Sequence, residues 1–499
     1  MTQMPIGAAI RWQAERHPHR PAITDAAGVG SASEQPARER SSSSAERTEN
    51  TVTRLELEHR TNRLARTYER LGVAEGDFVT IGLPNGIDFY EAAIAAWKLG
   101  ATPQPVSYRL PQRERDEIVA LAKPSLVVTE VIAPDEDASD EPILPDRTAP
   151  SLKAPTSGGS TGRPKVIVSA QPGVVDPEGP SGFNMTADGV QLVPGPLYHN
   201  APFQFSTAGL FKGCHLVVMS RFDAATALEL IERHSVDWVL MVPTMMLRIW
   251  RLPEAERLGR DLSSLKGILH LAAPCPPWLK EVWIEWLGAD VIWELYAGTE
   301  AQGVTIISGA DWMAHKGTVG KPAEGSMRIL DPDTRDELPP GEIGEVWMRP
   351  PAAATYRYLG AEARRDDVGW ESLGDMGSMD AEGYLYLADR RTDLILAGGA
   401  NIYPAEVEAA LEEHPAVRSC AVIGLPDEDL GQRVHALVEV AEGEDVTDDE
   451  LKLFLKERLV SYKIPRTFER SEGPVRDDAG KVRRSGLVND RTAPKENPS

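Results

Sequence analysis

Short apolar runs alternate with one-sided amphipathic stretches over about the first 315 residues of the chain. Short apolar runs are typical of buried strands, and a single apolar face is typical of a surface helix. Their alternation predicts an α/β fold, with mainly parallel sheets covered by helices. The expected strands are residues 78–83, 125–129, 166–168, 215–219, 238–242, 267–271 and 291–294, and the expected helices are residues 90–99, 224–234 and 277–287.

The pattern changes after about residue 315. Segments such as S-M-R-I-L-D and G-E-I-G-E-V-W-M-R predict short antiparallel strands joined by turns. A last segment alternates helix (405–413), strand (419–424), strand (434–440) and helix (448–460), and is long enough for a small α+β domain. We therefore predict an N-terminal domain over residues 1–391 and a C-terminal domain over residues 392–499. Within the first, the polar, low-complexity residues 27–52 predict a mobile surface insertion.

Composition narrows the class of protein. A chain of 499 residues is expected to form two or more domains. The net charge of −23 argues against nucleic acid or an anionic membrane as partner, although a local basic pocket remains compatible with it. The cysteines Cys214, Cys275 and Cys420 are far apart, which predicts a reducing, cytoplasmic setting without structural zinc. No secretory signal and no membrane-spanning apolar run is visible, so integral membrane association is not expected.

Candidate chemistry begins at residues 156–165, which read T-S-G-G-S-T-G-R-P-K. Glycines let backbone N–H groups turn toward an anion, and the hydroxyls add further donors. Lys165 adds a positive charge suited to a phosphate. These features predict a polyphosphate cradle. A flexible linker is the alternative, but a strand-like apolar run follows at 166–168. The P-loop order G-x-x-x-x-G-K-S/T is absent.

This segment resembles the phosphate loop of the adenylate-forming superfamily, which includes acyl-CoA synthetases, luciferases and peptide-synthetase adenylation domains. The family pattern is roughly S/T-S-G-S/T-T-G-x-P-K-G. This chain departs from it at Gly158, where serine is usual, and at Val166, where glycine is usual. The resemblance extends from about residue 5 to residue 488, with five motifs in family order. It implies that ATP is held by Ser157, Gly158, Gly159, Ser160, Thr161, Gly162 and Lys165.

A second motif, L-Y-A-G-T-E at 295–300, follows the strand expected at 291–294. Ligands gather at the carboxyl ends of strands in open α/β sheets, although a capped turn is the ordinary explanation for such a segment. The segment resembles the family motif Y-G-x-T-E. The resemblance implies that Tyr296 lies at the nucleotide, that Thr299 contacts phosphate and that Glu300 binds Mg²⁺. An upstream segment resembles the family stretch that lines the adenine, and consists of Ala272, Ala273 and Pro274.

A third motif runs from residue 374 to residue 395 and resembles the family string G-D-x-x-x-x-D-x-x-G-y-x-x-x-x-x-R-x-x-D-x-I. An isolated aspartate is ordinarily a turn residue. In the family pattern Asp375 accepts both ribose hydroxyls, which suits a carboxylate with two acceptor oxygens. Arg390 then reaches the ribose or a phosphate, and Thr392 is the hinge between the two domains.

Two further motifs lie in the predicted C-terminal domain. The resemblance makes Gly398 and Gly399 part of the loop that shapes a pantetheine tunnel for coenzyme A. The turn D-D-A-G-K-V-R-R presents Lys481, which by itself is an ordinary solvated lysine. In the family the equivalent lysine enters the site during adenylation and balances charge on the α-phosphate and the carboxylate. Lys463 is expected to help bind phosphate or coenzyme A.

The segment P-L-Y-H-N-A-P-F at 196–203 resembles the family segment beside the acid pocket. It implies that His199 orients the substrate carboxylate or gates the pocket. The predicted pocket residues are Asn200, Phe203, Phe205, Met241 and Val242, although apolar side chains of this kind are more often plain core. Their bulk favours an aromatic, fatty or polycyclic acid.

The resemblance implies an ATP-dependent acid–CoA ligase that uses ATP, Mg²⁺ and coenzyme A on a small-molecule acid. The expected fold has two α/β subdomains and a small β-barrel in the N-terminal domain, a mobile α+β C-terminal domain, and a homodimer as one assembly. One alternative keeps adenylation but changes the acid or acceptor, as in a carrier-protein ligase or a diazotase that activates nitrite toward an aryl amine. Another is a non-catalytic binding module, against which the joint presence of Lys481, Glu300 and Asp375 argues.

Overall fold

The computed structural model describes residues 3–26, 49–135, 138–139, 144–158, 164–351, 354–478 and 480–492. Most of the predicted insertion, residues 27–48, lies outside these ranges. Its last residues correct the prediction, because strand β3 (Asn50–Thr53) pairs antiparallel with β2 (Pro21–Ala26). The two strands also share a hydrogen bond between the hydroxyls of Thr24 and Thr51, 2.7 Å apart. A short polar edge strand carries no apolar signal, and the sequence pattern therefore missed it.

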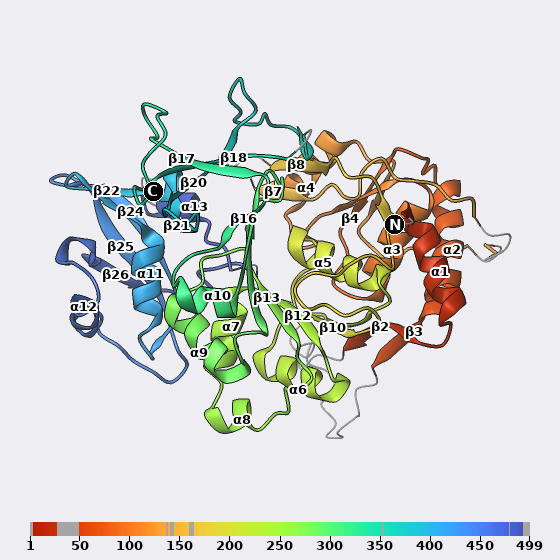
Figure 1. The fold of residues 1–499 in the computed structure, drawn as a ribbon, viewed down its shortest axis with the longest axis horizontal. Coiled ribbons are helices and arrows are strands. Elements are labelled where there is room, and N and C mark those ends of the chain that lie inside the picture. The colour runs from red at the N-terminus through yellow and green to blue at the C-terminus, as the bar shows by residue number, and fades with distance from the viewer. Residues whose placement is uncertain are drawn as a thin grey trace, which may run out of the picture.

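A nine-stranded sheet forms the centre of the molecule (Figure 1). Its order is β16-β15-β14-β13-β12-β10-β11-β2-β3; the strands from β14 to β2 run parallel, and the remaining edge strands are antiparallel. The structure confirms the predicted strands near residues 215, 238, 267 and 291. The bounds are β10 (Val190–Val193), β11 (His215–Met219), β12 (Trp238–Met241), β13 (Gly267–His270), β14 (Ile292–Ala297), β15 (Val304–Ser308) and β16 (Lys321–Glu324).

Alternate residues of the parallel strands pack into two different cores. In β11, Leu216 and Val218 belong to one cluster, and Val217 and Met219 to the other. Strands buried on both faces explain the nearly continuous apolar runs of the sequence. The helices of this region are α5 (Asn200–Phe211), α6 (Ala224–His234), α7 (Pro243–Trp250), α8 (Glu254–Leu258), α9 (Pro277–Leu287) and α10 (Gly309–Ala314).

A smaller parallel sheet, β5-β4-β6, belongs to a second α/β region near the N-terminus. Its helix α3 begins three residues before the predicted start at residue 90. The backbone N–H of Ile87 donates to Asp25 Oδ1 at 2.9 Å, a tertiary contact that anchors the earlier start. The bounds are α1 (Ile6–Arg16), α2 (Arg54–Arg70), β4 (Phe78–Ile81), α3 (Ile87–Lys98), β5 (Thr102–Pro105), α4 (Gln112–Ala122) and β6 (Leu126–Val128).

Antiparallel strands occupy the region after the central sheet, as the short turn-rich segments predicted. One sheet has the order β17-β18-β20-β21, and a second joins β19 to the hairpin β8-β7. The bounds are β7 (Thr156–Gly158), β8 (Pro164–Ser169), β17 (Ser326–Leu330), β18 (Gly344–Arg349), β19 (Tyr356–Leu359), β20 (Glu371–Met379) and β21 (Leu385–Arg390). A short pair is formed by β1 (Met4–Pro5) and β9 (Val174–Val175).

The C-terminal part, blue in Figure 1, is an α+β unit at one end of the molecule. Helix α12 is shorter than the predicted 448–460, and Val460 beyond its end is 53% exposed. The sequence also missed β26, which pairs parallel with β25. The bounds are η1 (Arg391–Asp393), β22 (Ile395–Ala397), β23 (Ala400–Ile402), α11 (Pro404–Glu412), β24 (Val417–Asp427), β25 (Gly431–Val440), α12 (Asp448–Lys456), η2 (Ser461–Lys463), β26 (Thr467–Arg470) and α13 (Arg484–Thr492).

These parts confirm the predicted α/β fold class, whereas the exact boundary at residues 391 and 392 stays a prediction. Among the helices in the described part of the chain, none is both long and apolar enough to cross a bilayer.

Candidate functional site

Several predicted site segments meet at the carboxyl edge of the central sheet. Residues 195–199 follow β10, Val242 follows β12 and residues 272–274 follow β13. Because these strands run parallel, their carboxyl ends lie at the same edge. Strand β14 continues three residues beyond Glu294, the residue paired with His270, and therefore includes Tyr296. This corrects the prediction that the strand ends at residue 294.

Glu300 is the buried carboxylate of the site. It lies in the turn after β14, next to the part-buried Thr299, and is 5% exposed. Lys165 Nζ lies 3.1 Å from Glu300 Oε1, and Tyr358 OH donates to the same oxygen at 2.5 Å. Lys165 also lies over the Tyr358 ring, 4.1 Å from its centroid. The structure thus joins the predicted phosphate lysine to the predicted Mg²⁺ carboxylate, through a tyrosine that no sequence motif indicated.

The phosphate loop itself is described only at its two ends. Ser157 and Gly158 belong to β7, and their backbone pairs with Lys165 and Pro164 of β8. The side chains that follow in the loop, those of Ser160 and Thr161 with Gly159 and Gly162 beside them, lie outside the described residues. The hairpin therefore fixes where the loop begins and ends.

Asp375 forms the second polar centre of the site. It lies in β20, paired in register with Arg390 of β21. Tyr296 OH donates to Asp375 Oδ2 at 2.7 Å, and Arg390 Nε donates to Asp375 Oδ1 at 3.2 Å. Tyr296 comes from the central sheet, and this contact holds the antiparallel sheet against it. The three residues that the nucleotide motifs selected are therefore in direct contact.

Lys481 reaches this site from the C-terminal part of the chain. Desolvation lowers the pKa of Lys481, although the residue keeps part of its surface exposed, and the nearby Arg390 guanidinium lowers that pKa further. The carboxylates of Asp477, Glu300 and Asp375 act in the opposite direction, so the charges of both polar centres reach the Lys481 amine. The Lys481 backbone N–H donates to Asp477 Oδ1 at 2.9 Å, and this bond closes the turn that presents the lysine.

Asp478 attaches the same turn to the N-terminal part of the molecule. Its carboxylate accepts a hydrogen bond from Tyr198, lies 3.1 Å from Arg109 Nη1 and lies 3.4 Å from His199 Nε2. Burial raises the pKa of Asp478, but the hydrogen bonds with His199 and Tyr198 outweigh it and leave that pKa below its usual value. The sequence motif indicated the turn but not Asp478, because the partners of Asp478 are about 280 and 370 residues away along the chain.

Close packing also holds the turn in place. Gly480 has a φ of +76°, and a Cβ built on it would lie 2.7 Å from Thr244 Oγ1 and 3.9 Å from Val242 Cγ2. Any side chain here would both strain the backbone and collide with α7. The predicted pocket residue Val242 therefore lies beside the lysine turn.

The residues present fit a magnesium ion held jointly with a phosphate. In the described ranges, no three His, Cys, Asp or Glu side chains gather in a way that could hold a metal by themselves. Mg²⁺ is usually bound through one or two carboxylates together with substrate phosphates. The hard oxygen ligands of Glu300, at the foot of the phosphate-loop hairpin, match that donor set.

Family models match most of the chain. The model of the AMP-binding enzyme matches residues 10–157 and 155–358, and the model of the AMP-binding enzyme C-terminal domain matches residues 406–475. The chain belongs to the AMP-binding enzyme family. The match covers the central sheet, the phosphate-loop hairpin and Glu300 in the first part, and most of the α+β unit in the second.

Individual relatives of this AMP-binding enzyme agree with that assignment. A feruloyl-CoA synthase of an Amycolatopsis species is 32% identical over 472 residues, covering 86% of this chain and 92% of the relative. The fatty acid–acyl-carrier-protein ligase ScoC of Streptomyces coeruleorubidus is 28% identical over 484 residues, covering 88% and 91%. The structure of o-succinylbenzoate-CoA synthetase from Bacillus subtilis, in complex with an acyl-adenylate intermediate, is 25% identical with a TM-score of 0.76, covering 100% and 99%.

The segment of this AMP-binding enzyme that was predicted to line the adenine begins two residues after the end of β13. Ala272 has a φ of +77°, which is costly for a residue with a Cβ, and its side chain is exposed. Ala273 is half-buried and Pro274 is exposed. The small side chains of this segment leave room for the flat adenine ring to approach the backbone. An adenine contact remains a proposal for these three residues.

The predicted hinge lies between two anchored residues. Thr392 is the middle residue of η1. On one side Arg391 Nη2 lies 3.3 Å from Asp333, in the N-terminal part. On the other side Asp393 Oδ2 lies 2.9 Å from Arg484 Nη1, in the C-terminal part. The residue before Thr392 thus pairs with the N-terminal part and the residue after it pairs with the C-terminal part, which supports the prediction of a hinge at Thr392.

The predicted coenzyme A residues all lie in the C-terminal unit. Gly398 and Gly399 form the two-residue turn of the β22–β23 hairpin, with φ angles of +58° and +82°. Two positive φ angles in succession favour glycine at both positions. Lys463 pairs with Glu406, with Nζ 2.6 Å from Oε2. The structure thus gives Lys463 a partner that the sequence pattern did not suggest.

The predicted pocket residues divide into core and accessible positions. Phe203 is 1% exposed and stacks on Trp97, with ring centroids 5.7 Å apart, and Met241 is fully buried in β12. Packing alone therefore accounts for both. Phe205 is half-buried, and Asn200 is the first residue of α5, directly after His199. The pocket role stays a prediction for all of these residues.

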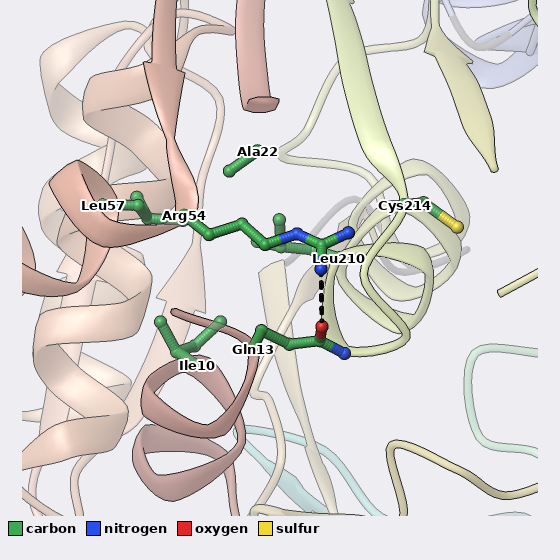
Figure 2. Close-up of a pocket in the computed structure, with 7 residues that line it drawn as sticks. All are labelled: Ile10, Gln13, Ala22, Arg54, Leu57, Leu210 and Cys214. Carbon is green, nitrogen blue, oxygen red and sulfur yellow. Dashed lines mark hydrogen bonds between the residues drawn. The ribbon is translucent and has the colours of Figure 1, made fainter. Parts of the chain in front are cut away.

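A small cavity elsewhere in the molecule is separate from these residues. Figure 2 shows its lining, which includes Ile10, Gln13 and Arg54 and none of the predicted site residues. Arg54 Nη1 donates to Gln13 Oε1 at 3.0 Å, and Nη2 lies 2.6 Å from Asp188. Because the Arg54 guanidinium is already paired with Asp188, we infer that the residues around this cavity have a structural role.

Replacing Asp375 by alanine is expected to weaken ATP binding about tenfold or more, because the carboxylate is the only predicted acceptor for the ribose hydroxyls. The ATP concentration dependence of pyrophosphate exchange measures the effect. Tyr296→Phe serves as the control, since it removes one partner of Asp375 but keeps the carboxylate, and it should have a smaller effect. An ATP affinity unchanged in Asp375→Ala would remove Asp375 from the site.

Proposed function

We propose that this AMP-binding enzyme is an ATP-dependent acid–CoA ligase that forms an acyl-AMP and transfers the acyl group to coenzyme A. The observation that carries the proposal is the docked turn that holds Asp477, Asp478, Gly480 and Lys481. The contacts of Asp478 with Tyr198 and Arg109 hold this turn, and Lys481 with it, against the N-terminal part. A pure binding module has no need for a lysine delivered to a nucleotide site by a separate part of the chain.

In the first half-reaction, a substrate carboxylate oxygen attacks the α-phosphorus of ATP, and pyrophosphate leaves. Lys481 would stabilise the negative charge that grows on the α-phosphate. Lys165 and the phosphate loop would hold the outer phosphates, and Asp375 the ribose. Mg²⁺, bound by Glu300, would supply Lewis-acid stabilisation of the phosphate oxygens. His199, fixed beside Asp478, would face the approaching substrate carboxylate.

In the second half-reaction, the thiol of coenzyme A attacks the acyl carbon and AMP leaves. The C-terminal unit would turn about Thr392, withdraw Lys481 and present the Gly398–Gly399 turn. To leave the adenylation orientation, the C-terminal unit would have to break the contacts of Asp478 with Tyr198, His199 and Arg109. The packing of Gly480 against Thr244 and Val242 would be released in the same motion.

The acceptor has one alternative with a specific observation behind it. The relative ScoC is named a carrier-protein ligase, and its similarity covers most of this chain. A carrier-protein thiol and the thiol of coenzyme A end in the same phosphopantetheine arm, so both could use the Gly398–Gly399 turn.

Substrate, assembly and location extend the proposal. The feruloyl and fatty-acid relatives favour an aromatic or fatty small-molecule acid. We infer a cytoplasmic location, since Cys214, Cys275 and Cys420 are all free thiols, and a homodimer as one assembly stays a prediction. Nucleic acid is an unsuitable partner for a chain with a net charge of −23.

A substrate screen tests the proposed function. AMP release would be measured for a panel of carboxylic acids and nitrite, with coenzyme A, with a carrier protein in its phosphopantetheinyl form, with an aryl amine, and with no acceptor. We expect acid-dependent AMP release that coenzyme A accelerates. Release that only nitrite and an aryl amine support would favour a diazotase, and ADP as the product would exclude adenylation.

A further inference from the structure

Lys153 is a buried lysine close to the phosphate-loop hairpin. It lies three residues before β7, and its carbonyl accepts a hydrogen bond from Ser169 N at 3.0 Å, which continues the pairing with β8. The residue is only 8% exposed. Its backbone is therefore fixed by the same hairpin that holds Lys165, while its amine points into the protein.

Among the described residues, the Lys153 amine lacks the acidic partner that the buried lysines Lys98 and Lys280 have. Lys98 lies 2.6 Å from Glu58, and Lys280 lies 2.6 Å from Glu294. Within the described residues, Lys153 Nζ has no ion pair, and its hydrogen-bond partner is the amide oxygen of Gln204. Burial lowers the pKa of Lys153 to about 7. A buried cation without an anion is costly, so the site is suited to an anion that arrives from outside.

Gln204 places this amine beside α5. Asn200 lies four residues before Gln204, and residues at this spacing share one face of a helix. Asn200 Oδ1 is buried and has no hydrogen-bond partner among the described residues. The residues at 200, 201, 204, 205 and 208 are partly accessible, whereas 202, 203, 206 and 207 are buried. Asn200 and Gln204 thus lie on the less covered face of α5.

The same helix begins at the proposed catalytic site. His199 is the N-cap of α5 and contacts Asp478 in the lysine turn. At a rise of about 1.5 Å per residue, Gln204 lies about 7 Å further along the axis than His199. An acid whose reacting carboxylate is near His199 would therefore extend along this face toward Gln204 and Lys153.

We propose that Lys153 and Gln204, with the Asn200 amide beside them, form the distal end of the acid pocket and bind a second carboxylate, so that the preferred substrate is a short, rigid dicarboxylic acid. This inference rests on the proposed function. Lys153 supplies N–H donors and positive charge, and a carboxylate can accept from both Lys153 and the Gln204 amide. A wholly apolar acid would leave the amine buried without an anion.

The test compares acids of one shape and different distal groups: terephthalate, 4-hydroxybenzoate and 4-methylbenzoate. AMP formation would be measured with the full-length protein. In the wild type we expect kcat/KM for terephthalate to exceed that for 4-methylbenzoate at least about tenfold, as a charge-assisted contact implies. Lys153→Met should lose this preference while it keeps, or gains, activity on 4-methylbenzoate. Lys212→Met, at the other end of α5, is the matched control and should keep the preference.

A second variant protects the test against misfolding. Gln204→Leu retains the lysine but removes the amide, and it should reduce the terephthalate preference in part. The inference would be overturned if the wild type preferred 4-methylbenzoate or 4-hydroxybenzoate to terephthalate. It would also be overturned if Lys153→Met lost the same fraction of its activity on all three acids. Either result would leave the proposed ligase function intact. If neither these acids nor the wider panel gives AMP with the wild type, the proposed function fails, and this inference fails with it.

Discussion

Replacing Lys481 by alanine is expected to reduce acyl-AMP formation by about two to three orders of magnitude, while thioester formation from supplied acyl-AMP stays near the wild-type rate. The reason is that Lys481 would meet the growing phosphate charge only in the first half-reaction. The amine has no role in the attack of a thiol on an activated acyl carbon. The effect of the variant should therefore fall on one half-reaction alone.

Two separate assays measure the split. Pyrophosphate exchange reports adenylation, and the release of AMP from purified acyl-AMP and coenzyme A reports thioester formation. Lys456→Ala, at the exposed end of α12, is the matched control and should change neither rate. Equal losses in both assays for Lys481→Ala would contradict the assigned role, because they would indicate damage to the fold or to a shared binding site.

A companion variant separates the lysine from the contacts that deliver it. Asp478→Ala keeps Lys481 but removes the bonds with Tyr198, His199 and Arg109. We expect a smaller fall in adenylation, in the same direction as for Lys481→Ala, because the turn would dock less often. An adenylation rate unchanged by Asp478→Ala would show that packing at Gly480 is sufficient to hold the turn.

Replacing Glu300 by glutamine is expected to raise the Mg²⁺ concentration needed for half-maximal adenylation at least about tenfold. Glutamine preserves the shape of the side chain and one acceptor oxygen for Tyr358, but it removes the negative charge that would bind the ion. It also leaves Lys165 without its acidic partner, which lies at 3.1 Å in the wild type. The loss should therefore appear mainly as a shifted Mg²⁺ dependence.

The measurement is a Mg²⁺ titration of pyrophosphate exchange at fixed ATP. Tyr358→Phe is the control, since it removes the 2.5 Å hydrogen bond to Glu300 but leaves the carboxylate in place. Its Mg²⁺ dependence should change much less than that of Glu300→Gln. Thermal unfolding of both variants checks the fold. A normal Mg²⁺ dependence in Glu300→Gln would remove Glu300 as the metal ligand.

Local sequence identified the elements whose signal is local. The apolar runs of β11, β12 and β13 are long enough to be recognised, because strands buried on both faces are apolar at most positions. Gly398 and Gly399 are recognisable for a similar reason, since two successive positive φ angles favour glycine. The polar edge strand β3 and the early start of α3 were missed. Both depend on a partner elsewhere in the chain, Thr24 in one case and Asp25 in the other.

By itself, the sequence determined the fold class and predicted the site residues, because motifs such as L-Y-A-G-T-E occur as continuous strings in the order of one family. Only the tertiary structure decided how they meet. It joined Lys165 to Glu300 through Tyr358, tied the lysine turn to His199 through Asp478, and left Lys153 buried without an acidic partner among the described residues. These contacts join residues far apart along the chain. Burial and electrostatics act through space, so no local pattern of residue types could encode them.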